Sequence, residues 1–168
     1  MDESGCYLLP GVVRTWARCG VTPVLHAPLT RDHVSLIGAV TPEGRLLVQL
    51  LTESVDSEVI ILWLEWLQKI LPGKLWILWD GAPIHRSKRL RAYLAEGASQ
   101  RIHLERYPGY APELNPAEGI WQHLKNCELR NRCCADLAAL KQEITVAIHR
   151  MQGNHELVKA FFKQVNYY

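Results

Sequence analysis

Residues 74–85, which read KLWILWDGAPIH, decide the fold class of this chain. Residues 74–79 are almost continuously apolar, as expected for a central strand covered on both faces of its sheet. The run ends in Asp80, and the glycine, alanine and proline that follow it predict a turn. Ligands of α/β proteins bind outside the carboxyl ends of such strands, and a carboxylate there is uncommon unless it is paired or ligated. Asp80 is therefore the first candidate functional residue.

The remaining sequence predicts an α/β domain with a mixed sheet. Residues 33–40 and 46–51 are β-rich runs joined by a Thr-Pro-Glu-Gly turn, which predicts a hairpin. A helix is expected to begin after Asp56 or Ser57 and to end at Pro72. Short strands are expected within residues 1–31 and a further strand over 102–107, with helices over 86–96, 117–130, 136–151 and 155–165.

The composition is that of one globular domain spanning residues 1–168. Hydrophobic residues make up 48% of the chain and charged residues 21%, which excludes disordered and fibrous classes. No apolar run approaches the ~20 residues of a membrane span, and the acidic start, MDESGC, is unlike a secretory signal. The five cysteines form no CxxC pair, which argues against a disulfide framework and a zinc ribbon. A cytoplasmic protein without membrane association is expected.

The small net charge of +2 hides an asymmetry. Residues 84–132 hold nine Lys and Arg residues against five Asp and Glu residues, so the remainder of the chain is slightly acidic. A basic segment of this kind is compatible with a polyanionic partner such as nucleic acid, or simply with a solvated surface. Charge alone leaves both interpretations open.

Two further acids stand where chemistry could use them. Asp2 lies at the start of the chain, and Glu118 lies at the start of a predicted helix after the sequence ELNPA. A carboxylate in the first turn of a helix is favoured by the helix dipole, so an ordinary structural role explains Glu118 equally well. Position alone therefore makes Asp80 the stronger candidate.

Two segments carry a resemblance to a known family. They are LWDGAPIHRSKRLRAYL, at residues 78–94, and ERYPGYAPELNPAEGIWQHLKN, at residues 105–126. Both closely resemble the catalytic domain of DDE transposases, in the mariner-like branch found in bacterial insertion sequences. The segments DESG, RTWARCGVTPVL and GRLLVQLLTESVDSEVIILWLEWL, at residues 2–5, 14–25 and 44–67, are also similar to that domain, so nearly the whole chain is covered.

The resemblance implies a ribonuclease-H-like fold with a mixed sheet flanked by helices. It places the three family acids at Asp2, Asp80 and Glu118, with 37 residues between the second and the third. Gly81 stands where the family often has asparagine. Because only Met1 precedes the first acid, the first strand is expected to be largely truncated, with Asp2 loosely held, and the N-terminal helix-turn-helix region is expected to be absent.

The implied activity is divalent-metal-dependent cleavage of DNA and strand transfer, that is, DNA transposition. Three carboxylates suit a two-metal site for Mg²⁺ or Mn²⁺, because these hard cations prefer oxygen ligands. Asp80 is expected to bridge both metals, with Asp2 and Glu118 each completing one site. The implied partners are transposon ends, target DNA and a second copy of the chain, in a nucleoid-associated protein. The alternatives are a noncatalytic truncated remnant that keeps the fold and DNA binding or oligomerisation, and a ribonuclease-H-like repair nuclease.

Several supporting residues accompany the three acids. Asn115 precedes a proline at the start of the Glu118 helix, where it is expected to cap the helix and so to support the carboxylate. Aromatic residues near the third acid could stack on unpaired bases or simply pack; they are Tyr107, Tyr110 and Trp121. The residues expected to contact DNA are His85, Arg86, Lys88, Arg89 and Lys125.

Overall fold

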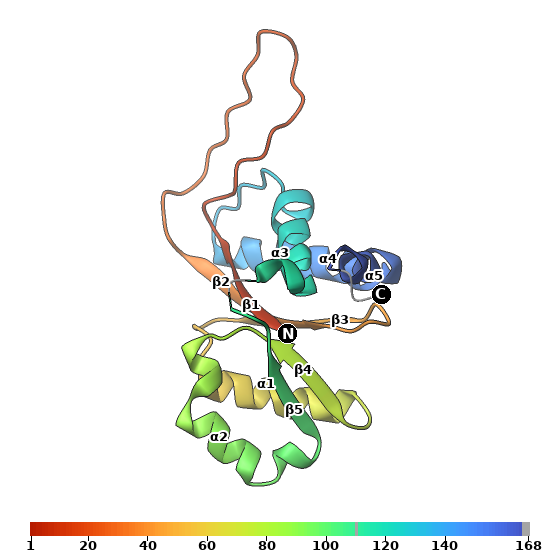
Figure 1. Ribbon diagram of the computed structural model, residues 1–168. Coiled ribbons are helices and arrows are strands. Elements are labelled where there is room, and N and C mark those ends of the chain that lie inside the picture. Colours follow the sequence, from red (N-terminus) through yellow and green to blue (C-terminus); the bar gives the residue numbers. More distant parts are fainter. Residues whose placement is uncertain (110, 166–168) are drawn as a thin grey trace.

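The computed structural model describes residues 1–109 and 111–165, and its strands form two ladders (Figure 1). In the first ladder, β1 (Asp2–Tyr7), β2 (His33–Val40) and β3 (Leu46–Leu51) pair antiparallel in the order β1-β2-β3. In the second, β4 (Leu75–Trp79) pairs parallel with β5 (Ile102–Arg106). The hairpin predicted over residues 33–51 and the strand that ends before Asp80 are both confirmed.

Helices cover both sides of these strands. They are α1 (Ser57–Ile70), α2 (Lys88–Ala95), α3 (Pro116–His123), α4 (Leu137–Gln152) and α5 (His155–Gln164). Short 3-10 turns span Pro83–Arg86, Ala98–Gln100 and Pro112–Leu114, and α3 continues into a π-helical turn over Leu124–Glu128. The helix predicted over 86–96 therefore consists of a 3-10 turn followed by α2.

Local sequence signals explain where α1 begins and ends. The side chain of Asp56 accepts hydrogen bonds from the backbone N–H groups of Glu58 and Val59, which satisfies two donors at the helix start. The helix ends at Ile70, and Pro72-Gly73 follows, where a glycine φ of 78° lets the chain reverse into β4. The buried apolar face of α1 carries Ile60, Trp63 and Leu64.

The strand β2 separates two hydrophobic cores. Val34 and Leu36 pack with α3, α4 and α5 on one face, whereas Ile37 packs with α1, α2, β4 and β5 on the other. This alternation is expected for a strand buried on both sides. Because Asp2 pairs with Gly38 in the antiparallel register, Asp2 points to the same face as Val34 and Leu36, toward α3. The sheet thereby delivers the first acid to the helix that carries the third.

The first strand is more complete than the sequence predicts. The sequence predicts that most of it is missing and that Asp2 is loosely held, but β1 runs downstream from Asp2 and all six of its residues pair with β2. Asp2 is only 7% exposed. Among the described residues β1 and β4 form no ladder, and the N-terminal amino group of Met1 donates a single hydrogen bond of 2.8 Å to the carbonyl oxygen of Leu78.

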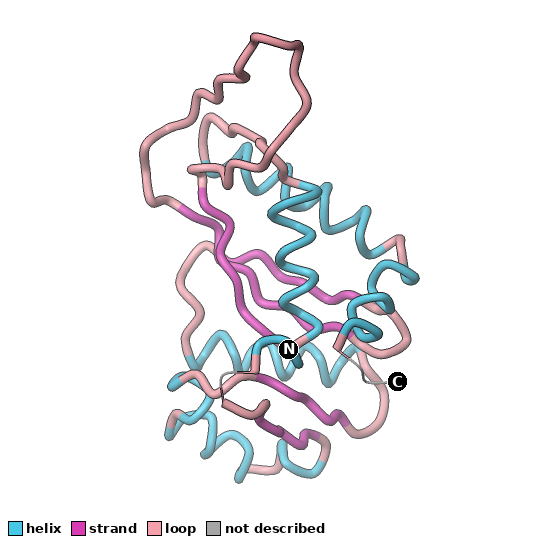
Figure 2. The backbone as a smooth tube through the Cα atoms, turned by 45° about the horizontal axis from the view of Figure 1, so that its top comes forward, coloured by secondary structure: helices cyan, strands magenta, loops and turns pink. Residues whose placement is uncertain are grey.

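Residues 8–32 form a long arm that extends beyond the sheet as an uninterrupted loop (Figures 1 and 2). The short strands expected within residues 1–31 are therefore limited to β1. The arm contains three prolines, which supply no backbone donor for a ladder: Pro10, Pro23 and Pro28. Large apolar side chains on the arm are nearly fully exposed, most of all Trp16 at 98% and Leu29 at 94%.

Candidate active site

The first acid is held by an aromatic side chain of α3. The indole N–H of Trp121 donates a 3.1 Å hydrogen bond to Oδ2 of Asp2, and both residues are buried. The indole lies against Gly38 of β2, where an added Cβ would come within 2.7 Å of the ring. Only glycine leaves room for the ring at that position. Trp121 therefore packs in the core and does not present a face on which a base could stack.

The third acid sits one helical turn before that tryptophan. Glu118 lies in the first turn of α3, and Asn115 is the N-cap, its side chain accepting a 3.1 Å hydrogen bond from the N–H of Ala117. A cavity of about 500 Å³ opens beside Glu118 and is also lined by Gln122 and Phe161. Residues three apart on a helix share a face, so Glu118 lies on the same face of α3 as Trp121, which contacts Asp2 of β1.

The charge of Glu118 acts on Asp2. The pKa of the Asp2 carboxyl is raised to about 6, mainly by burial and then by the nearby negative charges of Glu118 and Glu3, while the N-terminal amino group opposes the shift. A buried carboxylate with unbalanced negative neighbours is an environment that a cation would stabilise. The negative charge of Glu118 therefore makes Asp2 harder to ionise.

The second acid follows β4 and is bound to a histidine. Oδ1 of Asp80 accepts a 2.9 Å hydrogen bond from the N–H of Ala82 and lies 2.9 Å from Nδ1 of His85. The other ring nitrogen of His85 lies 3.1 Å from Oε1 of Glu3. Burial lowers the pKa of His85, but the hydrogen bonds and charges of Glu3 and Asp80 outweigh this effect and raise it above its ordinary value.

His85, one of the predicted DNA contacts, is buried. Its side chain is 1% exposed, and its two ring nitrogens lie 3.1 Å and 2.9 Å from carboxylate oxygens of Glu3 and Asp80. Sequence reasoning also missed Glu3, although it directly follows the first acid. Strand alternation places the side chain of Glu3 on the opposite face of β1 from Asp2, toward His85, and that pattern could have revealed it.

The remaining predicted DNA contacts lie on the surface. Arg86 and Lys88 are exposed beside the second acid, whereas the guanidinium of Arg89 donates two hydrogen bonds to the Glu58 carboxylate. Of the aromatic residues near Glu118, Tyr107 is half-buried, and Tyr110 lies outside the described residues.

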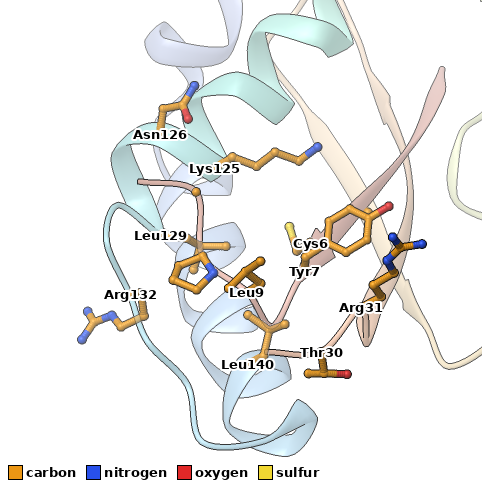
Figure 3. Close-up of a pocket in the computed structure, with 13 residues that line it drawn as sticks. Cys6, Tyr7, Leu9, Thr30, Arg31, Lys125, Asn126, Leu129, Arg132 and Leu140 are labelled. Atoms are coloured by element: carbon orange, nitrogen blue, oxygen red, sulfur yellow. The ribbon is translucent and has the colours of Figure 1, made fainter. Parts of the chain in front are cut away.

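Lys125 lies further along the same face of β1 as Asp2. Its ammonium group donates a 2.8 Å hydrogen bond to Oγ of Ser4, two residues beyond Asp2. Lys125 also borders a pocket of about 350 Å³ at the end of β1. Figure 3 shows its side chain reaching across this pocket toward the strand, with Arg31 near Tyr7 on the other side. Asp2 and this pocket therefore lie along the same strand, β1.

The three acids suit a divalent cation by their chemistry. All are oxygen donors, as Mg²⁺ and Mn²⁺ prefer, and the pKa of Asp2 is raised mainly by burial and then by the negative charges of Glu118 and Glu3. In the part of the chain that the structure describes, no three His, Cys, Asp or Glu side chains stand close enough together to hold a metal ion as they are. The three carboxylates are suitable ligands for Mg²⁺ or Mn²⁺, but their side chains would have to move closer together to bind one ion.

The fold defines a ribonuclease-H-like domain, in which Asp2 lies on the edge strand β1 and Asp80 directly follows β4. The family model of the DDE superfamily endonucleases matches residues 1–141. The chain therefore belongs to the DDE superfamily of endonucleases. No curated protein sequence matches it.

Solved structures of Mos1 transposase share this fold. The chain is similar to the Mos1 paired-end complex with the left transposon end, at 17% identity and a TM-score of 0.64, and the match covers 99% of this chain and 55% of that one. It is similar to the Mos1 mariner paired-end complex with Mn at 18% identity and a TM-score of 0.62, over 99% and 55% of the two chains. The Mos1 catalytic domain matches at 15% identity and a TM-score of 0.53, over 99% and 82%. The chain thus spans about half the length of the paired-end transposase chains.

Within the described ranges, 1–109 and 111–165, no helix is long and apolar enough to cross a membrane.

Proposed function

We propose that this chain is the catalytic domain of a transposase, a single domain over residues 1–168 that cleaves DNA at transposon ends and joins the freed 3′ hydroxyl to target DNA. One observation carries the proposal. The first and third acids of a DDE endonuclease, Asp2 on β1 and Glu118 on α3, interact electrostatically. The second acid, Asp80, directly follows β4, and the amino group of Met1, the residue before β1, donates a hydrogen bond to Leu78 of that strand. Membership of the DDE superfamily of endonucleases supports it.

The chemistry follows from what these side chains can do. Mg²⁺ or Mn²⁺ held by the three carboxylates would activate the attacking oxygen and neutralise charge on the leaving oxygen. Asp80 is the proposed shared ligand: one of its oxygens is held by Ala82 and His85, which leaves Oδ2 to face the cations. Asp2 keeps one oxygen on Trp121 and offers the other.

The proposed DNA path runs along the exposed cations near these acids. Lys125 contacts the DNA phosphate backbone beside the cleavage site, because Ser4 holds the Lys125 ammonium group on the same face of β1 as Asp2. Arg86 and Lys88 contact DNA on the Asp80 side, where both are exposed, and Arg89 joins them when Glu58 releases it. Such phosphate contacts give affinity that depends on salt but carry no sequence information.

The proposed partners are transposon ends, target DNA and a second copy of the chain in a nucleoid-associated cytoplasmic complex. The similar Mos1 structures include paired-end complexes with a transposon end, which supports DNA partners. The nearly fully exposed Trp16 and Leu29 on the arm support a homodimer, because large apolar side chains gathered on an extended segment mark interaction surfaces.

Metal-dependent cleavage tests the proposal. Wild-type chain should nick and join transposon-end DNA with Mn²⁺ or Mg²⁺, and Asp80→Ala and Glu118→Ala should each abolish cleavage while circular dichroism stays unchanged. Asp32→Asn is the matched control, because Asp32 is an exposed carboxylate outside the site. Activity that persists in Asp80→Ala would refute the proposed role of this acid.

The second candidate is a noncatalytic remnant that keeps the fold and DNA binding or oligomerisation. The observation that favours it is the absence, among the described residues, of three metal-ligating side chains already brought together. Calorimetry with Mn²⁺ separates the two functions. Binding that the Asp80→Ala and Glu118→Ala double variant loses supports the enzyme, whereas a folded wild type that binds no Mn²⁺ supports the remnant.

A further inference from the structure

The second acid belongs to a different ladder from the first. Asp2 is in β1, Asp80 follows β4, and one backbone hydrogen bond from Met1 joins the two ladders at this point among the described residues. Two carboxylates that share metal ions must keep a fixed separation, and a regular ladder would normally supply it. Here the backbone supplies little of that constraint, so side chains must supply the rest.

His85 is placed to supply it. Nε2 of His85 lies 3.1 Å from Oε1 of Glu3 on β1, and Nδ1 lies 2.9 Å from Oδ1 of Asp80 after β4. The imidazole also stacks on Trp79, with ring centres 4.2 Å apart and planes within 3° of parallel. The ring is thus fixed in its plane while its two nitrogens face carboxylates from different ladders.

The surroundings of this ring exceed what packing requires. An apolar ring would stack on Trp79 equally well and would need no partners in the interior, whereas His85 has a 1% exposed side chain and two engaged nitrogens. Glu3 is 17% exposed at its side chain, and its Oε1 lies 3.1 Å from Nε2 of His85. Asp80, by contrast, is 52% exposed and would turn freely in solvent without the bonds to Oδ1.

We propose that His85 is a positioning residue, which together with Glu3 ties the Asp80 carboxylate to β1 and so sets its place relative to Asp2. The inference rests on the proposed function, because it assigns the bridge to the metal-binding carboxylates. His85 itself touches neither metal nor DNA in this scheme. Partners of this kind typically change metal affinity or activity by about 10- to 100-fold when they are removed.

The decisive variants change Glu3, which does not touch Asp80. Glu3→Ala breaks the bridge at its far end, whereas Glu3→Gln removes the charge but keeps an amide that can pair with His85 in either tautomer. We expect Glu3→Ala to weaken Mn²⁺ binding by about 10-fold in calorimetry and Glu3→Gln to restore most of it. In DNA cleavage, Glu3→Ala should lower kcat with little change in KM for DNA. His85→Phe, which keeps the stacking but neither nitrogen, should lose at least as much.

A second measurement uses the metal-free protein. The N–H of Ala82 donates to the same Oδ1 of Asp80 that faces His85, so release of Asp80 should speed hydrogen exchange at this amide. We expect faster exchange in Glu3→Ala than in Glu3→Gln, with thermal unfolding confirming that both variants fold. Equal exchange and equal Mn²⁺ affinity in Glu3→Ala and wild type would overturn the bridge, as would a Glu3→Gln variant as weak as Glu3→Ala. A wild type that binds no Mn²⁺ overturns the proposed function, and Ala82 exchange still decides the bridge.

Discussion

The contact between Trp121 and Gly38 should be detectable as an energetic coupling. An added Cβ at Gly38 would lie 2.7 Å from Cη2 and 3.0 Å from Cζ2 of the indole, and real Cβ contacts are not that short. Overpacking of this kind costs about 1–3 kcal/mol. We expect Gly38→Ala to lower the free energy of unfolding by about 2 kcal/mol, which corresponds to roughly 4–8 °C in Tm for a domain of this size.

Phenylalanine lacks both of the ring atoms that an alanine at position 38 would meet. In a Trp121→Phe background, Gly38→Ala should therefore cost less than about 1 kcal/mol, although the carbonyl oxygen of Leu47 remains 3.3 Å from the new Cβ. Urea unfolding of the wild type, both single variants and the double variant gives the coupling energy. Gly5→Ala on β1 is the matched control, because its nearest contact, at 3.6 Å, is ordinary.

The same variants report on the site. Moving the indole also moves the donor to Asp2, so Gly38→Ala should weaken Mn²⁺ binding measured by calorimetry, and Gly5→Ala should leave it unchanged. Equal destabilisation by Gly38→Ala in the wild-type and Trp121→Phe backgrounds would refute the steric argument. Unchanged Mn²⁺ affinity in a destabilised Gly38→Ala protein would refute the link from this contact to the first acid.

Three other predictions concern charge. The pKa of Asp2 is about 6 in the folded protein and near 4 in the unfolded chain, so ionisation of Asp2 destabilises the fold as pH rises through that range. The Asp2→Asn variant should therefore be more stable than wild type by up to about 3 kcal/mol at pH 8, with little difference at pH 4. Urea unfolding with a chelator present measures this difference. Lys125→Ala should weaken DNA binding similarly for all sequences and reduce the slope of log affinity against log salt by about 1. The control is Lys69→Ala in α1, on the far side of the sheet, which should change neither the affinity nor the slope. Glu58→Ala should strengthen DNA binding in a fluorescence titration, because it frees the Arg89 guanidinium; unchanged affinity would remove Arg89 from the DNA path.

The sequence predicts this fold wherever the local pattern matches the tertiary environment. The apolar run before Asp80 and the cap at Asp56 each correspond to an observed element. The sequence does not predict the arm, because its apolar residues have a strand-like composition but form no ladder among the described residues, and strand pairing is a long-range property.

The candidate site shows the same division. The three acids could be placed through the resemblance to DDE transposases, and the cap at Asn115 from its position before Pro116. The role of His85 could not be predicted, because it depends on Glu3, which lies 82 residues away in sequence and is brought near only by the packing of two ladders. A histidine beside a basic helix has the same local pattern whether it faces solvent or the interior.

Because the strands form two ladders, the three acids lie at the boundary between the two hydrophobic cores. Asp2 and Glu118 belong to elements of the core around α3 and α4, whereas Asp80 follows a strand of the core around α1 and α2. A cation that binds all three acids would therefore hold one half of the domain to the other, and its binding energy would add to the cohesion of the fold. Metal binding would then stabilise the contact between the two cores, and amide hydrogen exchange in both ladders would be slower in the metal-bound protein.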